Sequence, residues 1–263
     1  MHPFEDLPVA AGKIGLQWFG QNSFALKDSA GAIIQVDPYF PWERPATQFI
    51  HPRPPLDEAT LRTDLVLLTH DHGDHTCVES LSRLRDAFPH AMYVGPSESM
   101  DRLRGSGFVA DRLQPIAAGE RWEWGSVAVN AVWSKPPGGL PDDDIGAPDV
   151  QHLGYVVEAG TERVYITGDL VNTFANHEEL LAPVRALRPT LGILTTHPTE
   201  GEFPDFCGCA RLAVEVGLRA AVPAHYGCFV SRTYDPRQWA AHLQGVLPVV
   251  IGYNQSVVYP SGD

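Results

Sequence analysis

The run THDHGDH at residues 69–75 constrains the fold more than any other part of the chain. It sets three imidazoles and a carboxylate in the pattern HxHxDH, directly after the apolar run LVLL at 65–68. That apolar run is typical of a fully buried strand, so the polar cluster lies where a strand ends and a loop begins. Packing these side chains there without a cation would leave several of them poorly satisfied. The pattern therefore favours a metal site.

The spacing within the run fits binding of two ions. Residues two apart in an extended segment point to the same side, so His70 and His72 can bind one cation together. Gly73 allows a sharp turn, after which Asp74 and His75 can face a second cation. The sequence therefore predicts ligands for two neighbouring ions within one loop.

Several sequence blocks resemble the metallo-β-lactamase superfamily. Together with HxHxDH they are WFGQNSF at 18–24, VDPY at 36–39, YITGD at 165–169 and VPAHY at 222–226. In this order they look like the L-ascorbate 6-phosphate lactonase-like branch, and the HxHxDH, Gly-Asp and late His blocks carry most of the specificity. The resemblance covers most of the chain. It implies an α+β fold, the αββα four-layer sandwich, in which two strand-rich halves bring the ligands to one edge.

The resemblance also implies further ligands. Asp169 matches the carboxylate that bridges both ions in the family, and His225 matches its late metal-binding histidine. The remaining ligand follows from a predicted hairpin, in which strands at 153–158 and 163–167 flank AGTE at 159–162. Symmetric pairing about this turn places His152 opposite Asp169, so His152 is expected as a third imidazole on the first ion. A supporting position beside that ion stays open, because many family members carry this histidine further upstream.

The ligands divide into two expected sets. His70, His72 and His152 would hold the first ion, whereas Asp74, His75 and His225 would hold the second. Asp169 would bridge the two. These ligands suit zinc, manganese or iron. The lactonase-like branch implies manganese, and the family at large implies zinc.

Periodicity predicts alternating strands and helices around these blocks. Strands are expected near 14–19, 23–27, 32–37, 65–69, 91–94, 113–116, 127–133, 191–195 and 220–224, and helices near 97–104 and 206–217. Thr76 and Glu79 form a capping-box pattern for a helix after the motif loop, and Asn176 and Glu179 suggest a cap for a helix carrying Leu180 to Leu187. Residues 136–144 are expected to form a loop.

Hydrolysis by a metal-bridging hydroxide is the predicted reaction. A hydroxide held between two cations forms near neutral pH, so no activated serine or cysteine is required, and the chain has neither GxSxG nor a P-loop. Asp74 would orient the hydroxide. The predicted substrate is a lactone or a phosphorylated small molecule. Phosphodiester cleavage is the alternative reaction, and an iron-dependent oxygenase or a metal-binding module is the alternative class.

Two further polar residues follow strand ends. His197 comes after the strand at 191–195, where it would donate a proton or stabilise an oxyanion, or else support neighbouring groups by hydrogen bonding. Tyr226 would reach the substrate or pack. A phosphate group would need cations, for which Lys135, Arg232 and the helix start at 205–211 are candidates by their position in loops.

Composition narrows the class of protein. A chain of 263 residues with 44% hydrophobic content can bury a large core and is expected to form one domain over 1–263. Its net charge of -13 argues against nucleic-acid or anionic-membrane partners, so a small-molecule substrate is expected, with a homo-oligomer possible in principle. Neither a membrane span nor a signal peptide is evident, which predicts a cytoplasmic protein. Four scattered cysteines are expected as small packed thiols, namely Cys77, Cys207, Cys209 and Cys228.

Overall fold

Two seven-stranded sheets form the centre of the protein, and the computed structural model describes residues 2–199 and 201–260. The first sheet has the order β14-β1-β2-β3-β4-β5-β6. Its strands are β1 (Ile14–Trp18), β2 (Phe24–Lys27), β3 (Ile33–Val36), β4 (Leu65–Leu67), β5 (Met92–Gly95), β6 (Leu113–Pro115) and β14 (Gln255–Tyr259).

The second sheet has the order β13-β12-β11-β10-β9-β8-β7. Its strands are β7 (Arg121–Trp124), β8 (Val127–Lys135), β9 (His152–Ala159), β10 (Glu162–Ile166), β11 (Leu191–Thr195), β12 (Ala220–Ala224) and β13 (Leu247–Pro248). The α-helices are α1 (Val78–Ala87), α2 (Ser97–Gly105), α3 (Glu178–Ala186), α4 (Phe206–Glu215) and α5 (Pro236–Ala240). Short 3₁₀ helices occupy Pro3–Asp6, Glu58–Thr60, Ala110–Arg112, Pro141–Asp143 and Phe174–Asn176.

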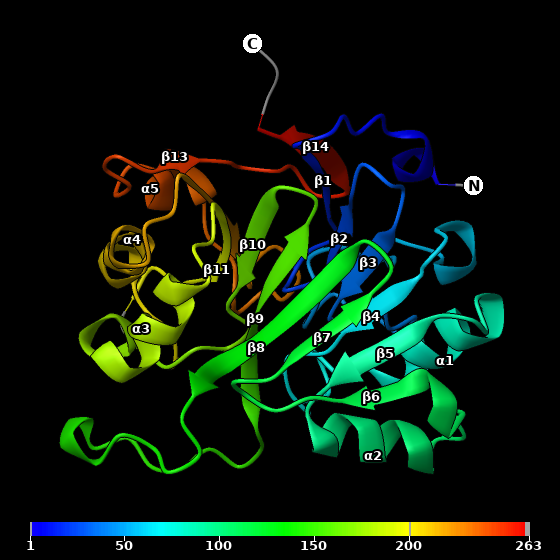
Figure 1. Cartoon of the computed structure of the whole chain (residues 1–263), viewed down its shortest axis with the longest axis horizontal. Coiled ribbons are helices and arrows are strands. Elements are labelled where there is room, and N and C mark those ends of the chain that lie inside the picture. Colours follow the sequence, from blue (N-terminus) through cyan, green and yellow to red (C-terminus); the bar gives the residue numbers. More distant parts are fainter. Residues whose placement is uncertain (1, 200, 261–263) are drawn as a thin grey trace.

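Buried apolar layers hold the helices and sheets together. The layer between the sheets combines residues of both, such as Leu67 from β4 and Ile166 from β10. A second layer lies under α1 and α2, and a third under α3, α4 and α5. Figure 1 shows these two helix groups on opposite outer sides of the paired sheets. The predicted αββα sandwich is therefore confirmed. No described helix has the length and apolar character needed to cross a membrane.

Strand direction brings the polar strand ends to one edge. β3 and β4 are parallel, as are β10, β11 and β12, so their carboxyl ends lie on the same side of each sheet. Backbone and side-chain hydrogen bonds join the two sheets there: Leu153 N donates to Thr69 O at 2.9 Å, and Tyr155 Oη donates to Leu68 O at 2.6 Å. A Cβ on Gly168 would lie 2.8 Å from Thr69 Cβ, so only glycine permits this close approach.

The predicted hairpin is confirmed. Its pairing runs from Ala159 with Glu162 to Tyr155 with Ile166, and the same register continued by three residues leads to His152 and Asp169. The predicted strand at 65–69 ends earlier, at Leu67, because Thr69 leaves the sheet to bond to Asp37. Strands β7, β13 and β14 were not predicted, since short edge strands carry little periodic signal.

Both predicted helix caps are wrong. α1 begins after Cys77, and the Thr76 hydroxyl donates instead to His70 O at 2.8 Å. α3 begins after His177 without a side-chain cap, because Asn176 accepts a hydrogen bond from Arg211. In both cases a hydrogen bond to another residue replaces the bond that the capping pattern predicts.

Candidate metal centre

The first group of possible ligands contains three imidazoles. His70, His72 and His152 offer nitrogen atoms that all lie within 4.8 Å of one another. His70 Nε2 is 3.1 Å from His72 Nδ1, and the His152 ring stacks on His70 with centroids 4.1 Å apart. His152 is buried, and neither of its ring nitrogens has a hydrogen-bond partner among the described residues. Such an orphaned pair of nitrogens fits a metal ligand.

The second group lies on the other side of Asp169. It consists of Asp74, His75 and His225, whose ligand atoms also lie within 4.8 Å of one another. His75 Nε2 lies 3.8 Å from Asp74 Oδ2, and His225 follows the carboxyl end of β12. The three side chains therefore form a separate set of donors beside the first.

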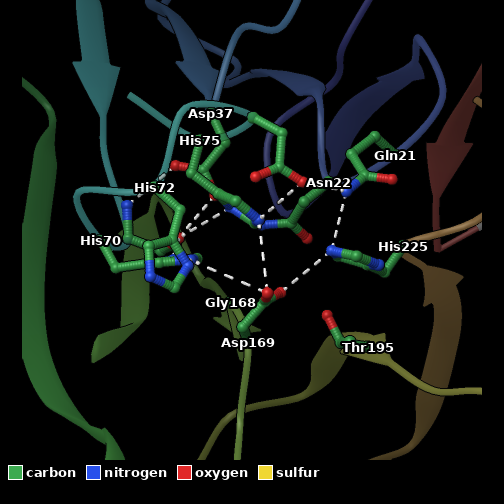
Figure 2. Close-up of polar contacts among 12 residues, drawn as sticks. Gln21, Asn22, Asp37, His70, His72, His75, Gly168, Asp169, Thr195 and His225 are labelled. Atoms are coloured by element: carbon green, nitrogen blue, oxygen red, sulfur yellow. Dashed lines mark hydrogen bonds and ion pairs between the residues drawn. The ribbon is translucent and has the colours of Figure 1, made fainter. Parts of the chain in front are cut away.

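Asp169 lies between the two groups. Its Oδ2 is 3.7 Å from His70 Nε2 and 3.5 Å from His75 Nε2, whereas its Oδ1 is 3.3 Å from His225 Nε2. Figure 2 shows the rings directed at this carboxylate from both sides. A carboxylate in this position can contact cations in both groups. All seven predicted metal ligands are thus brought together, and their role as ligands stays a prediction.

Asp37 supports the centre and was missed as a functional residue, although it lies in the VDPY block. It is fully buried and accepts hydrogen bonds from His75 Nδ1 at 2.7 Å, Thr69 N at 2.8 Å and Asn22 Nδ2 at 2.6 Å. This arrangement leaves His75 Nε2 facing Asp169 and Asp74. A carboxylate behind a histidine in this way fixes the ring for metal binding.

Asp149 orients the His72 ring in the same way, and it too was missed as a functional residue. Its carboxylate lies 3.0 Å from His72 Nε2, which leaves Nδ1 on the side of His70. Asp149 comes from the segment between β8 and β9, 77 residues away from His72 in sequence. No local pattern in the sequence indicates this contact.

The pKa values of the histidines are shifted in different directions. Burial lowers the pKa of His152 to about 3, and the nearby charge of Lys135 adds to this shift. Burial and the neighbouring His75 likewise hold the pKa of His70 well below its ordinary value. Burial of His75 opposes its charged form, but the carboxylates of Asp169, Asp74 and Asp37 raise its pKa well above the ordinary value.

Three residues of the centre adopt a left-handed backbone. Gln21, Asp37 and His225 have φ angles of 54°, 41° and 67°, a region that non-glycine residues rarely adopt. Each such residue costs roughly 1–3 kcal/mol and persists only where the surroundings enforce it. Their concentration around one cluster indicates a functional site rather than ordinary packing.

The donor set fits divalent transition metals. Imidazole nitrogens and carboxylate oxygens are ligands for zinc, manganese and iron. His75 Nε2 and Asp169 Oδ1 are buried without a hydrogen-bond partner among the described residues, as expected where a cation completes the site.

The structure does not bring His197 into this cluster. It belongs to neither ligand group, its Nδ1 lies 3.2 Å from Thr199 Oγ1, and it lines a neighbouring depression with Phe203 and Arg232. Its predicted catalytic role stays a prediction. Tyr226 is buried and stacks on Trp18 with centroids 4.4 Å apart, so it packs.

The other polar candidates have mixed outcomes. Glu202 contacts both basic side chains that were predicted to bind a phosphate group, at 3.7 Å from Lys135 Nζ and 2.9 Å from Arg232. The start of α4 is capped by its own Asp205, which accepts from Gly208 N. All four cysteines are free, and the prediction of packed thiols is wrong for Cys207, which is exposed 3.3 Å from His242 Nδ1.

Comparison with known proteins agrees with this fold. A model of the beta-lactamase superfamily domain matches residues 33–226, which include the HxHxDH run and all seven ligands predicted from the sequence. The chain therefore belongs to the metallo-β-lactamase superfamily. It is 26% identical over 250 residues to a UPF0173 metal-dependent hydrolase from Anaeromyxobacter sp. (strain K), covering 90% of this chain and 83% of that protein.

Two solved structures show the same fold at low identity. Igni18, a metallo hydrolase from Ignicoccus hospitalis, superposes with a TM-score of 0.68 at 18% identity, covering 95% of this chain and 100% of the other. An isothiocyanate hydrolase from Delia radicum gut bacteria gives a TM-score of 0.68 at 14% identity, covering 92% and 98%. At these identities the likeness concerns the fold alone.

Proposed function

We propose that this protein is a metal-dependent hydrolase that acts on a lactone or a phosphorylated small molecule. The observation that carries the proposal is the meeting of two three-residue donor groups at Asp169. Relatives of this chain are named metal-dependent hydrolases, which supports the same class.

Two divalent ions held by these groups would bring the pKa of water towards neutrality and stabilise negative charge on a substrate oxygen. The chain supplies the frame for that chemistry. Asp37 orients His75, and Asp149 orients His72, so each ring presents one fixed nitrogen. Asp74 is partly exposed beside the second group, where its carboxylate can hold the attacking water in position.

A cavity of about 360 Å³ beside the first group is the proposed substrate site. Its lining includes His152, Lys135, Asn172, Asp149 and Glu202. Lys135 pairs with His152 across the β8–β9 ladder, so one cationic side chain lies directly next to a ligand. This position supports a substrate whose phosphate or carboxylate group binds Lys135 while its reacting bond lies over Asp169. The lactonase-like assignment rests on this feature.

His197 and Arg232 extend the proposed site on its far side. Arg232 shares Glu202 with Lys135, and His197 lines the same depression as Arg232. We place His197 as a proton donor or oxyanion contact for a substrate that spans both depressions. The acidic composition of the chain argues against nucleic acid as a partner, and a small molecule remains the proposed partner.

A substrate panel tests the proposed function. The protein is loaded with Zn²⁺ or Mn²⁺ and assayed on phosphorylated lactones, neutral lactones and phosphodiesters. Turnover of phosphorylated lactones well above neutral ones is expected. Phosphodiester cleavage alone would favour the alternative reaction. Without hydrolysis of any member, oxygen consumption by the Fe²⁺-loaded protein would indicate an oxygenase, and its absence a metal-binding module.

A further inference from the structure

Gln21 lies among the residues of the second ligand group, although it is not one of the seven predicted ligands. It follows β1, and its side chain is buried, with 1% exposure. Its Nε2 is 2.8 Å from Asp74 Oδ2 and 2.7 Å from His225 Nε2. Both of these atoms belong to residues of the second group, and Figure 2 shows the amide of Gln21 facing the His225 ring.

The spacing of the amide matches that of a ligand. Donor atoms bound to one transition-metal ion at roughly 2.0–2.2 Å lie about 3 Å from their neighbours. The amide end of Gln21 keeps this distance from two candidate donors at once. In the metal-free protein its NH₂ group can donate to both acceptors, but an ion bound to the same acceptors would exclude those hydrogens.

The other end of the amide has no competing partner. Oε1 of Gln21 is buried and forms no hydrogen bond with any described residue. Rotation of the amide by 180° exchanges the positions of Oε1 and Nε2. The carbonyl oxygen then faces the ligand group, where it can bind an ion, in place of the NH₂ group. The exchange needs no movement of the backbone.

The backbone of Gln21 is held firmly in this position. Gln21 N donates to Tyr226 O at 2.8 Å, and His225 N donates to Gln21 O at 3.1 Å. Trp18 Nε1 donates to the same carbonyl at 3.2 Å. These bonds enforce its left-handed φ of 54° and tie it directly to the segment that carries His225.

We infer that Gln21 is a ligand of the second ion through Oε1, an inference that rests on the two-ion centre of the proposed function. The second ion would then have three oxygen-bearing ligands, Asp74, Asp169 and Gln21, beside two imidazoles. The first group offers three imidazoles and shares only Asp169. Because oxygen donors suit manganese and imidazoles suit zinc, Gln21 makes the second site the more manganese-selective of the two.

Titration of the metal-free full-length chain with Mn²⁺ alone tests the inference. Free Mn²⁺ is followed by its electron paramagnetic resonance signal, which gives the affinity of each equivalent without any substrate. In Gln21→Met, which keeps the length of the side chain but lacks the oxygen, the second equivalent should bind about ten- to a hundredfold more weakly. The first equivalent should be unchanged. Gln21→Glu, which retains an oxygen donor, should bind the second equivalent at least as tightly as the wild type.

Gln17→Ala is the matched control. Gln17 is also buried and lies on β1, but its amide bonds to Asn254 at 3.0 Å and contacts no member of either group. It should leave both affinities unchanged. Thermal unfolding of each metal-free variant, together with the first-equivalent affinity, establishes that the fold is intact.

The outcomes separate this inference from the proposed function. If Gln21→Met binds the second equivalent within about twofold of the wild type, or more tightly, then Gln21 only competes with the ion, and the inference is overturned while the two-ion centre stands. Wild-type protein that binds a single equivalent would overturn both. If the wild type binds two equivalents, Gln21→Met weakens the second, and the loaded protein hydrolyses no substrate, then Gln21 is a ligand and only the proposed hydrolase function is rejected.

Discussion

Asp37 Oδ2 lies 2.7 Å from His75 Nδ1, and both side chains are fully buried. Asp37 directly follows β3, and His75 lies in the loop between the adjacent parallel strand β4 and α1, so the pairing of the two strands brings the residues together. It sets which nitrogen of His75 faces the second group. The metal affinity of that group should therefore depend on a residue that is not itself a ligand.

Replacement of Asp37 tests this dependence. Asp37→Asn should weaken binding of the second ion by about ten- to a hundredfold, since loss of a carboxylate behind a ligating histidine has effects of that size. Isothermal titration with Zn²⁺ measures the change. Asp64→Asn is the control, because Asp64 also accepts a backbone hydrogen bond, from Ile33 N at 2.9 Å, but lies before β4. Equal affinities in wild type and Asp37→Asn would contradict the role assigned to Asp37.

His152 should be needed for the first ion. Its stacked position on His70 and its two orphaned nitrogens predict that His152→Ala loses at least about tenfold in affinity for that ion. The affinity of the second ion should change far less. The exposed His90 provides a control variant, His90→Ala. Undiminished first-ion binding in His152→Ala would remove His152 from the ligand set.

Metal content should follow the two groups. Reconstituted wild-type protein should carry close to two ions per chain, because each of the two ligand groups beside Asp169 offers three donors, and His225→Ala should carry one. Asp169→Asn should lower the occupancy of both sites, since this carboxylate lies between them. Elemental analysis after dialysis measures the content. A wild-type value of one, unchanged by His225→Ala, would rule out the two-ion centre.

Metal binding should release protons unequally. His75 has a raised pKa in the metal-free protein and thus holds a proton at pH 7 that an ion must displace, whereas His152, with a pKa of about 3, is already neutral. Second-ion affinity should therefore rise with pH by up to about tenfold per unit until the pKa of His75 is passed. Calorimetry in buffers of different ionisation enthalpy counts the protons. Equal proton release for both ions would disprove this assignment.

Replacement of Asp74 should reduce turnover more than replacement of His197. Asp74→Asn should reduce turnover by several orders of magnitude, because the carboxylate belongs to the second group and faces its open side. His197→Ala should retain full metal content, since His197 lies outside both groups, and should lose less activity, about ten- to a thousandfold. Wild-type turnover in fully loaded Asp74→Asn would exclude the proposed role of Asp74.

Much of the centre could be predicted because its ligands follow local rules. His70, His72, Asp74 and His75 lie within one loop after a buried strand, so spacing alone places them together. The position of His152 opposite Asp169 follows from the symmetric register of a short hairpin, whereas Asp169 and His225 were predicted from the resemblance to the superfamily. These are short-range relationships, in which the backbone geometry of a strand or turn fixes the separation of the side chains.

Only the tertiary structure decided what surrounds the ligands. The contact of Gln21 with His225 spans 204 positions in sequence, that of His72 with Asp149 spans 77, and that of His75 with Asp37 spans 38. The same holds at the start of α3, where Arg211, 35 positions away, binds Asn176 in place of the predicted cap. A local pattern records the geometry of a strand, turn or loop. It carries no information on which strand ends meet, and that depends on how the two sheets pack.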